Sequence, residues 1–230
     1  MPSTFSKAIK VIQHIEKKGF NAYFVGGCVR DLIIGRPVGD IDIATSAKPF
    51  DIQHIFRKVI PVGIEHGTVI VRWEGDSFEV TTFRLENTYS DQRHPDNVTF
   101  VQTIDQDLKR RDFTMNAIAM DKTGNIVDPY GGKKDIEHRQ IRAVGNGYDR
   151  FHEDPLRIIR AVRFSSQLGF TIEKHTLNDM LKVRDQIRHL AVERLTVEIT
   201  KLFAGDFIDK GMSYLNKTRI LNELPIFKEH

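Results

Sequence analysis

The stretch at residues 21–46, NAYFVGGCVRDLIIGRPVGDIDIATS, limits the possible fold more than any other part of this chain. A short apolar run ends in Gly26 and Gly27, a helical pattern follows until Gly35, and the chain then alternates polar and apolar residues. Such alternation predicts a β-strand with one buried face, because successive side chains of a strand point to opposite sides. The stretch therefore predicts a strand, a helix and a second strand of an α+β unit.

Asp40 and Asp42 lie in the alternating part, beside Ile41 and Ile43. We expect the isoleucines to face the core and both aspartates to face the other side, with Cα atoms roughly 6–7 Å apart. Two like charges at that separation repel each other, and Asp is uncommon in strands. Water, an arginine or a divalent metal could compensate, and the spacing alone leaves all three open.

The glycine pair favours a site for an anion. A strand that ends in two glycines and runs into a helix lets a ligand approach the backbone, and the helix N-terminus favours negative charge. A tight turn would explain Gly26 and Gly27 alone, but Arg30 lies one turn into the helix and the two aspartates follow. Together these residues predict a phosphate site beside a carboxylate pair, Asp40 and Asp42, that holds Mg²⁺ for nucleotidyl transfer.

A third carboxylate could come from Glu79. The segment 76–84 predicts a strand of a hairpin, and its period of two places Glu79 on the same face as Ser77 and Thr81. Glu79 is then either a third catalytic carboxylate or an exposed residue of the hairpin.

The remaining chain changes in character near residue 145. Before it, strands alternate with helices, and a polar stretch at 85–97 without periodicity predicts a mobile loop. After it the pattern is largely helical, so we expect a catalytic α+β head at 1–145 and a helical neck at 146–230, which could include the start of a further domain. The other expected helices are 4–18, 48–59, 103–121, 152–168, 173–187, 191–204 and 206–217. The other expected strands are 66–75 and 98–101, and 124–132 predicts a strand followed by a turn.

The sequence RRDFTMNA at 110–117 joins two arginines to Asp112 and Asn116. Residues four apart share one face of a helix, so Asp112 and Asn116 could together hold a ribose hydroxyl. Ion pairing at the surface would explain the same residues.

A second basic segment, HEDPLRIIRAVRF, lies at 152–164. Asp154 before a proline predicts a helix start, with Asp154 as its cap. Arg157, Arg160 and Arg163 recur every three residues, and such a stripe repels itself unless an anion such as a triphosphate or an RNA phosphate lies near. Asp and Arg can also present paired acceptors and donors to the edge of a base.

Net charge, cysteine content and the lengths of apolar runs place few limits on the function of the chain. The net charge is only +3, so it does not by itself indicate nucleic acid. The one cysteine, Cys28, predicts a reduced thiol, and no run of residues resembles a signal peptide or a membrane span. These two features predict a cytoplasmic protein. No Cys/His spacing indicates zinc, and nothing indicates a protein partner.

Taken in order, several motifs resemble the class II tRNA nucleotidyltransferases, which are the bacterial CCA-adding enzymes. The resemblance runs from about residue 5 to about residue 205. It implies an α+β fold with a head of polymerase-beta type, built on a mixed sheet and followed by a helical neck. The motifs are FVGGCVRDLIIGRPVGDIDIAT, RRDFTMNAIAMD, DPYGGKKDIEHRQIRAVG, FHEDPLRIIRAVRF and ERLTVEITKLF.

The resemblance also implies an activity, the Mg²⁺-dependent addition of C, C and A to the 3′ end of tRNA from CTP and ATP without a nucleic-acid template. It implies that Asp40 and Asp42 carry the metals, that the RRD motif contacts the sugar, and that the loop at 85–97 serves addition of the final A. Asp154 and Arg157 would read the Watson–Crick edge of the incoming base. The residues that would bind the nucleotide are Gly27, Arg30, Arg111, Asp154, Arg157, Arg160 and Arg163.

Several alternatives stay open. Bacterial poly(A) polymerases share the head, but they usually carry a stretch of the form GRRFRLAHV where this chain has VGIEHGTVIV. An enzyme that adds only CC or only A, and a weakly active fragment that binds nucleotide or RNA, are the others. Family members usually continue into helical body and tail domains that grip tRNA, so we expect intact nucleotide binding and reduced turnover of tRNA.

Overall fold

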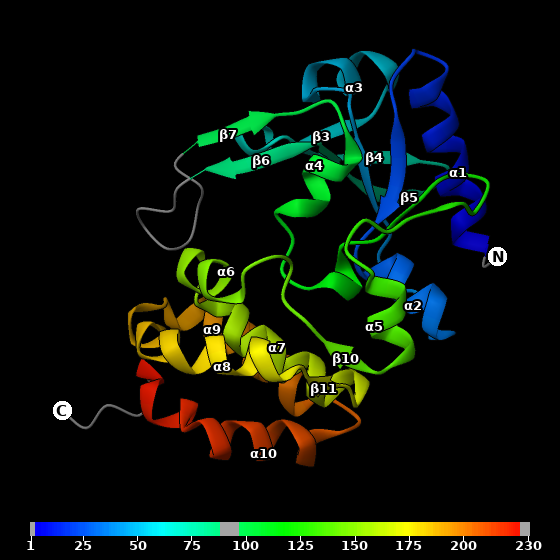
Figure 1. The fold of residues 1–230 in the computed structure, drawn as a ribbon. Helices are drawn as coiled ribbons and strands as arrows, with labels where there is room; N and C mark the ends of the chain where they lie inside the picture. Colours follow the sequence, from blue (N-terminus) through cyan, green and yellow to red (C-terminus); the bar gives the residue numbers. More distant parts are fainter. Residues whose placement is uncertain (1–2, 88–96, 226–230) are drawn as a thin grey trace. The chain divides into compact units, whose positions relative to one another are not determined.

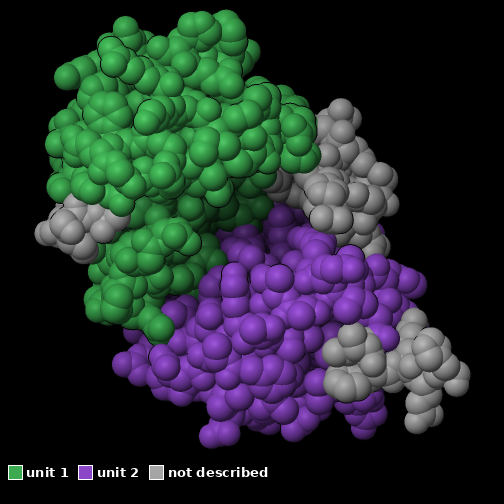
Figure 2. Space-filling model, turned by 180° about the vertical axis from the view of Figure 1, so that it is seen from behind, with its two compact units in different colours: residues 1–87, 96–111, 115–133 green, residues 88–95, 112–114, 134–230 purple. Residues whose placement is uncertain are grey.

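The computed structural model describes residues 3–87 and 97–225 (Figure 1). These residues form two compact units, which Figure 2 colours separately. Unit 1 contains residues 3–87, 97–111 and 115–133, and unit 2 contains residues 112–114 and 134–225. The chain therefore enters unit 2 briefly at 112–114 and returns to unit 1.

Unit 1 is built on a mixed sheet of seven strands within the described residues, in the order β3-β4-β5-β2-β1-β8-β9. The central pair β2 and β5 is parallel, and the other neighbours are antiparallel. This confirms the mixed sheet that the family resemblance implies. The strands are β1 (Ala22–Val25), β2 (Asp42–Thr45), β3 (Val59–Gly63), β4 (Thr68–Trp73), β5 (Asp76–Thr82), β8 (Ala119–Met120) and β9 (Ile126–Val127).

Helices and a hairpin complete unit 1. The amphipathic helix α1 buries Phe5, whose ring meets Phe24 of β1 edge to face at 5.0 Å between centroids. The hairpin pairs β6 (Arg84–Asn87) with β7 (Asn97–Phe100). The helices are α1 (Ser3–Glu16), α2 (Gly27–Ile34), α3 (Pro49–Ile55) and α4 (Ile104–Lys109), and α5 (Gly132–Glu137) leads from unit 1 into unit 2.

The helix expected at 103–121 is wrong beyond residue 109. After α4 the chain is extended at Phe113, which bridges to Ala143, and it then forms a short 3₁₀ turn at Thr114–Asn116. The N–H of Thr114 donates to the carbonyl of Arg142, so pairing with a distant segment replaces the local helix. Asp112 and Asn116 therefore do not share a helical face.

Smaller differences from the expected elements concern β3, at one edge of the seven-stranded sheet, and β6 of the separate two-stranded sheet. The helix expected at 48–59 ends at Ile55, and the residues after it form the edge strand β3. The first residues of the stretch expected as a mobile loop, 85–87, belong to β6, and positions 88–96 lie outside the described residues. In both places a strand partner decides a conformation that the local pattern does not specify.

Unit 2 is largely helical and centres on α7 (Leu156–Leu168), which is buried over most of its length. The other helices are α6 (Gly147–Glu153), α8 (Lys174–Val183), α9 (Val192–Phe203) and α10 (Ile208–Thr218), and two short strands, β10 (Gln140–Ile141) and β11 (Thr171–Ile172), pair in parallel. Gly205 packs so closely on Ser166 that a Cβ there would lie 2.3 Å from the Ser166 Oγ. Of the helices in residues 3–87 and 97–225, none is both long enough and apolar enough to span a bilayer.

Candidate active site

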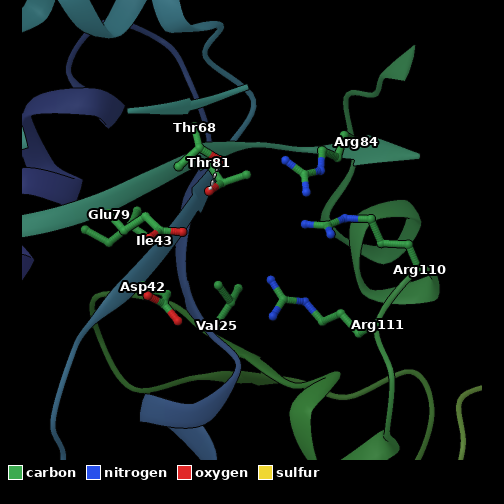
Figure 3. A pocket seen from close by; sticks show the side chains of 9 residues that line it. All are labelled: Val25, Asp42, Ile43, Thr68, Glu79, Thr81, Arg84, Arg110 and Arg111. Atoms are coloured by element: carbon green, nitrogen blue, oxygen red, sulfur yellow. Dashed lines mark hydrogen bonds between the residues drawn. The ribbon is translucent and has the colours of Figure 1, made fainter. Parts of the chain in front are cut away.

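A pocket of about 190 Å³ lies within unit 1 and brings two acidic side chains opposite three arginines. In Figure 3 the carboxylates come from the sheet, and the guanidinium groups point toward them from the other wall. Its lining residues are Val25, Asp42, Ile43, Thr68, Glu79, Thr81, Arg84, Arg110 and Arg111. The pocket thus combines groups that hold cations with groups that hold phosphates.

The two carboxylates meet because β2 and β5 pair in parallel with Asp42 opposite Glu79. Ile43, the next residue of β2, is buried in the core as expected. The expectation that Asp40 also belongs to this strand is wrong, because β2 begins at Asp42, where its partner β1 ends at Val25. Asp40 is an exposed residue of the bend before the strand.

The surroundings of Asp42 raise its pKa above the ordinary value of an aspartate. Burial is the main cause that raises the pKa of Asp42 to about 6; the charges of Glu79 and Asp40 act in the same direction, and Arg111 opposes them. A carboxylate crowded by other carboxylates gains most from a bound cation, and oxygen donors suit Mg²⁺. Within the described residues no three His, Cys, Asp or Glu side chains already form a complete metal cluster.

Arg84, Arg110 and Arg111 form one wall of the pocket, which we call the arginine wall. All three are bonded to Asp107, a fully buried residue of α4 that the sequence interpretation missed. Its carboxylate accepts from Arg110 Nε at 3.0 Å and from Arg111 Nη2 at 3.2 Å, and it also accepts from the backbone N–H of Arg84 at 3.2 Å. Burial alone would raise the pKa of Asp107, but the charges of Arg110 and Arg111 outweigh burial and lower it. Asp107 lies three residues before Arg110 and four before Arg111, and this helical spacing could have predicted the two ion pairs from the sequence.

The turn at Gly26 and Gly27, which we call the glycine turn, lies against Arg111 of the arginine wall. Gly26 has φ 73° and ψ −132°, a conformation that favours glycine, and a Cβ there would lie 2.9 Å from Arg111 Nη1. Gly27 is the first residue of α2. The missing side chain at Gly26 therefore lets the guanidinium of Arg111 lie against the turn.

Arg30 is buried in unit 1 and fixed by two neighbours. Its Nη1 donates to Asn116 Oδ1 at 2.7 Å, and its Nε donates to Asp31 at 2.9 Å. Asn116, which we expected beside a sugar, is thus a partner of the predicted phosphate-binding arginine.

In unit 2 the arginine stripe of α7 has acidic partners. Arg160 donates to Asp112 Oδ2 at 2.6 Å, Arg163 pairs with Glu198 at 3.0 Å, and Arg157 pairs with Glu153 at 2.9 Å. Burial would lower the pKa of Arg160, but the charges of Asp112 and Glu198 raise it. The expectation that this stripe needs an outside anion is therefore wrong. Asp112 and Glu198 come from distant parts of the sequence, so the pattern of the helix does not reveal them.

Asp154 does cap α7, since its Oδ1 accepts from the N–H of Leu156 at 3.1 Å. Its Oδ2 accepts from Arg194 Nη2 at 2.9 Å, a partner on α9 that the sequence interpretation missed. Both oxygens of Asp154 thus have partners in unit 2.

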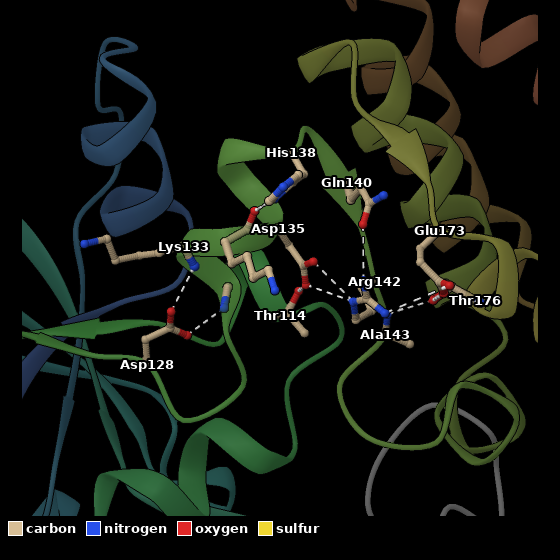
Figure 4. A network of polar contacts seen from close by, with 12 residues as sticks. Thr114, Asp128, Lys133, Asp135, His138, Gln140, Arg142, Ala143, Glu173 and Thr176 are labelled. Carbon is tan, nitrogen blue, oxygen red and sulfur yellow. Dashed lines mark hydrogen bonds and ion pairs between the residues drawn. The ribbon is translucent and has the colours of Figure 1, made fainter.

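Residues 112–114 are anchored in unit 2 by a polar network (Figure 4). Thr114 Oγ1 donates to Asp135 Oδ2 at 2.6 Å, and Asp135 also accepts from Arg142 Nε at 3.1 Å. Glu173 lies 4.0 Å from Arg142 and caps α8. This network holds Thr114 in unit 2, and the bond from Arg160 holds Asp112 there.

Comparison with known proteins identifies the family. Residues 22–142 match the profile of the poly(A) polymerase head domain, which covers more than half of the chain. The chain belongs to the poly(A) polymerase head-domain family. Residues 169–230 match a second profile, described as a probable RNA- and SrmB-binding site of polymerase A.

Curated proteins that resemble the chain include CCA-adding enzymes. That of Oceanobacillus iheyensis is 54% identical over 97% of this chain, and that of Levilactobacillus brevis is 50% identical over 100%. This chain spans 56% and 58% of their respective lengths. The family resemblance inferred from the motifs is thus confirmed.

A solved structure of the Bacillus stearothermophilus CCA-adding enzyme in complex with CTP superposes with a TM-score of 0.92 at 48% identity. The match covers 98% of this chain and 55% of that protein. This confirms the polymerase-beta-like nucleotidyltransferase fold of the head-domain protein.

Proposed function

We propose that this protein adds C, C and A to the 3′ end of tRNA, using CTP and ATP and releasing pyrophosphate. The observation that carries this proposal is the match in sequence and fold to a CCA-adding enzyme in complex with CTP. Similar solved structures include one with a primer tRNA and an incoming ATP analogue, at 28% identity and a TM-score of 0.76. Because the chain spans about half the length of its relatives, substrates and activity are proposed for the longer protein.

We assign Asp42 and Asp40 as the residues that hold Mg²⁺, with Glu79 as a third acidic group beside them. The raised pKa of Asp42 and the all-oxygen donors support this fit, because a divalent cation would relieve the repulsion. Such an ion would make the 3′-hydroxyl of the RNA more acidic and offset charge on the triphosphate.

The triphosphate binds, in this proposal, at the glycine turn. Gly27 contributes the N-terminal N–H groups of α2, Arg111 lies against Gly26, and Arg30 is held in place by Asn116. Backbone N–H groups at a helix N-terminus and guanidinium groups both bind phosphate oxygens. These residues bind and orient the nucleotide so that its α-phosphorus lies near Asp42.

Selection of the base is assigned to unit 2. Asp154 and Arg157 would read the base edge, and Arg160 and Arg163 would line the same nucleotide. The ion pairs to Asp112, Glu153 and Glu198 support a positioning role, because a guanidinium held on one side presents its remaining N–H groups in a fixed direction. Asp112, bonded to Arg160, remains the proposed contact to the sugar, and we propose Asn116 as an indirect contributor through Arg30.

We also propose a cytoplasmic location. Cys28 is buried and free, and burial raises the pKa of its thiol to about 11, so it stays protonated. A reducing compartment that contains tRNA suits such a thiol.

One assay tests the function. Transfer RNA that lacks CCA, ends in C or ends in CC is incubated with Mg²⁺ and with CTP and ATP, singly and together. Completion of CCA on all three RNAs supports the proposal. Products that stop at CC would instead indicate a CC-adding enzyme, and addition of A to RNA ending in CC alone would indicate an A-adding enzyme. Long A tails on a generic RNA with ATP alone would instead support a poly(A) polymerase, which the family description also allows.

A further inference from the structure

The face of the sheet that holds Asp42 and Glu79 continues past the pocket onto two further strands. Directly opposite residues of neighbouring strands share a face, and the register places Ile70 of β4 opposite Glu79 of β5 and Ile60 of β3 opposite Ile70. Asp42 lies on the other side of Glu79. One row of side chains therefore crosses the sheet, and its members are, in order, Asp42, Glu79, Ile70 and Ile60.

Two basic side chains belong to the next row of the same face. Lys58 and Arg72 lie two residues along their strands from Ile60 and Ile70, so they point to the same side. The N–H of Arg72 donates to the carbonyl of Lys58 at 2.9 Å, and Arg72 Nη1 donates to the hydroxyl of Ser77 on β5 at 2.5 Å. The residues of this region, which we call the open face, are Lys58, Ile60, Ile70, Arg72 and Ser77.

The open face is directed away from the core. Val69 and Val71, which alternate with the open-face residues of β4, are fully buried, whereas Ile60 is 46% exposed. Lys58 and Arg72 are also exposed. In the part of the chain that the structure describes, neither of these two cations forms an ion pair with an acidic side chain. The open face therefore presents two positive charges and an apolar surface beside the carboxylates.

The chemistry of the proposed function relates the open face to the nucleotide. In phosphoryl transfer the attacking and leaving oxygens lie roughly in line, on opposite sides of the phosphorus. The proposed function places the leaving pyrophosphate at the glycine turn, which follows β1. Along the sheet the strands follow in the order β1, β2, β5, β4 and β3, so the open face lies on the far side of Asp42 from that turn. The attacking 3′-hydroxyl therefore approaches from the open face.

The composition of the open face suits the end of a single RNA strand. Surfaces that bind single strands without sequence preference carry positive groups along the path of the backbone, as Lys58 and Arg72 do here. Apolar side chains such as Ile60 can cover the faces of sugars and bases. Because β3 lies two strand spacings, roughly 10 Å, from β5, the open face has room for the last nucleotides of a strand only.

We propose that the open face binds the 3′-terminal nucleotides of the acceptor RNA and directs their hydroxyl toward Asp42. This inference rests on the proposed function, because the reaction at Asp42 requires an RNA end beside it. Lys58 and Arg72 contact backbone phosphates, and Ile60 and Ile70 pack against the sugar and base of the last nucleotides. Contacts to the backbone and to apolar surface carry little sequence information, so the open face accepts strands that end in different nucleotides.

The first test measures the kinetics of ATP addition to RNA ending in CC. In Lys58→Ala, Arg72→Ala and Ile60→Asn we expect the apparent KM for RNA to rise by roughly 5- to 10-fold, while the KM for ATP changes less than about twofold. Arg72→Lys keeps the positive charge, so its KM for RNA should stay within about threefold of the wild-type value. Lys18→Ala is the matched control, because Lys18 is an exposed lysine that follows α1, and it should change neither KM.

A second readout does not depend on turnover. Binding of a labelled single-stranded RNA ending in CC is followed by fluorescence anisotropy at several salt concentrations. Each lost phosphate contact should reduce the slope of log K against log salt by roughly 0.7, so the double variant Lys58→Ala/Arg72→Ala should lose about 1.4. Ile60→Asn should weaken binding without a change of slope, because it removes no charge.

The outcomes separate the open face from the proposed function. A wild-type protein that shows the expected binding slopes but adds no nucleotide would contradict the proposed function and support the RNA surface. An unchanged KM for RNA with an unchanged salt slope in the double variant would overturn the role of the open face, even in a fully active enzyme. A rise in the KM for ATP alone would overturn it as well. Thermal unfolding checks that each variant is folded, and Arg72→Gln replaces Arg72→Ala if the latter is not.

Discussion

Asp42 on β2 lies directly opposite Glu79 on β5 in the parallel pairing at the centre of the sheet. The two carboxylates come from separate stretches of sequence, and the charge of Glu79 adds to the burial that raises the pKa of Asp42. Parallel neighbours cannot be connected by a tight turn, so only the assembled sheet brings these residues together. The sheet therefore holds two carboxylates at a place where their charges oppose folding.

Replacing Asp42 should stabilise the metal-free protein at neutral pH. Because its folded pKa is about 6 against an ordinary value of 3.8, the charged side chain destabilises the folded state above pH 6, and this cost disappears as the pH falls below 4. Asp42→Asn should raise the free energy of unfolding by about 1–3 kcal/mol at pH 7. Urea unfolding in EDTA between pH 4 and pH 7 measures this, and a difference that is constant with pH would contradict it.

The three acidic groups should differ in their effect on nucleotide addition. Asp42→Ala should abolish activity, and Asp40→Ala should reduce kcat by at least roughly 100-fold, because each removes an assigned metal ligand. Glu79→Gln keeps the size of the side chain, and we expect a loss nearer 10-fold if Glu79 acts through charge alone. Activity measured over a range of Mg²⁺ concentrations checks this, because loss of a metal ligand should raise the Mg²⁺ concentration needed for half-maximal activity. Full activity of Asp42→Ala would refute the assignment.

Asp107 should be essential for the arginine wall. Asp107→Asn removes the charge between Arg110 and Arg111, and breaking a buried ion pair typically costs about 3–5 kcal/mol. We expect a lower free energy of unfolding and, in the folded fraction at low temperature, a higher KM for ATP. Asp105→Asn is the matched control, because Asp105 is an exposed acid of the same helix. Equal effects of the two variants would show that Asp107 has no special role.

Sequence patterns predicted most of the elements but not the partners of the site residues. The alternation around Ile43 gave the correct buried face, and the glycine turn and α2 occur where the pattern indicates. The pairing of Asp42 with Glu79 depends on strand order, which periodicity does not contain. The helix expected at 103–121 stopped early because Phe113 pairs with Ala143, a long-range contact that overrides helix propensity.

Gly26 should matter more than its conformation alone requires. Gly26 and Gly35 both have positive φ, 73° and 78°, so alanine at either position strains the backbone by about 1–3 kcal/mol. A Cβ at Gly26 would also displace the Arg111 guanidinium, whereas nothing lies within 4 Å of a Cβ at Gly35. Gly26→Ala should therefore raise the KM for nucleotide, and Gly35→Ala should only lower stability. A similar change of KM in both variants would contradict this reading.

Glu198 should link the stability of unit 2 to selection of the base. Its buried carboxylate pairs with Arg163 at 3.0 Å and lies 3.6 Å from Arg160, so Glu198→Gln removes the negative charge shared by two arginines. We expect a loss of about 3 kcal/mol in the free energy of unfolding and a reduced discrimination between CTP and UTP, because the guanidinium groups lose a fixed orientation. Glu193→Gln, on the exposed side of the same helix, is the control. Thermal unfolding and single-nucleotide addition to tRNA measure the two effects, and unchanged discrimination in a destabilised Glu198→Gln would restrict Glu198 to folding.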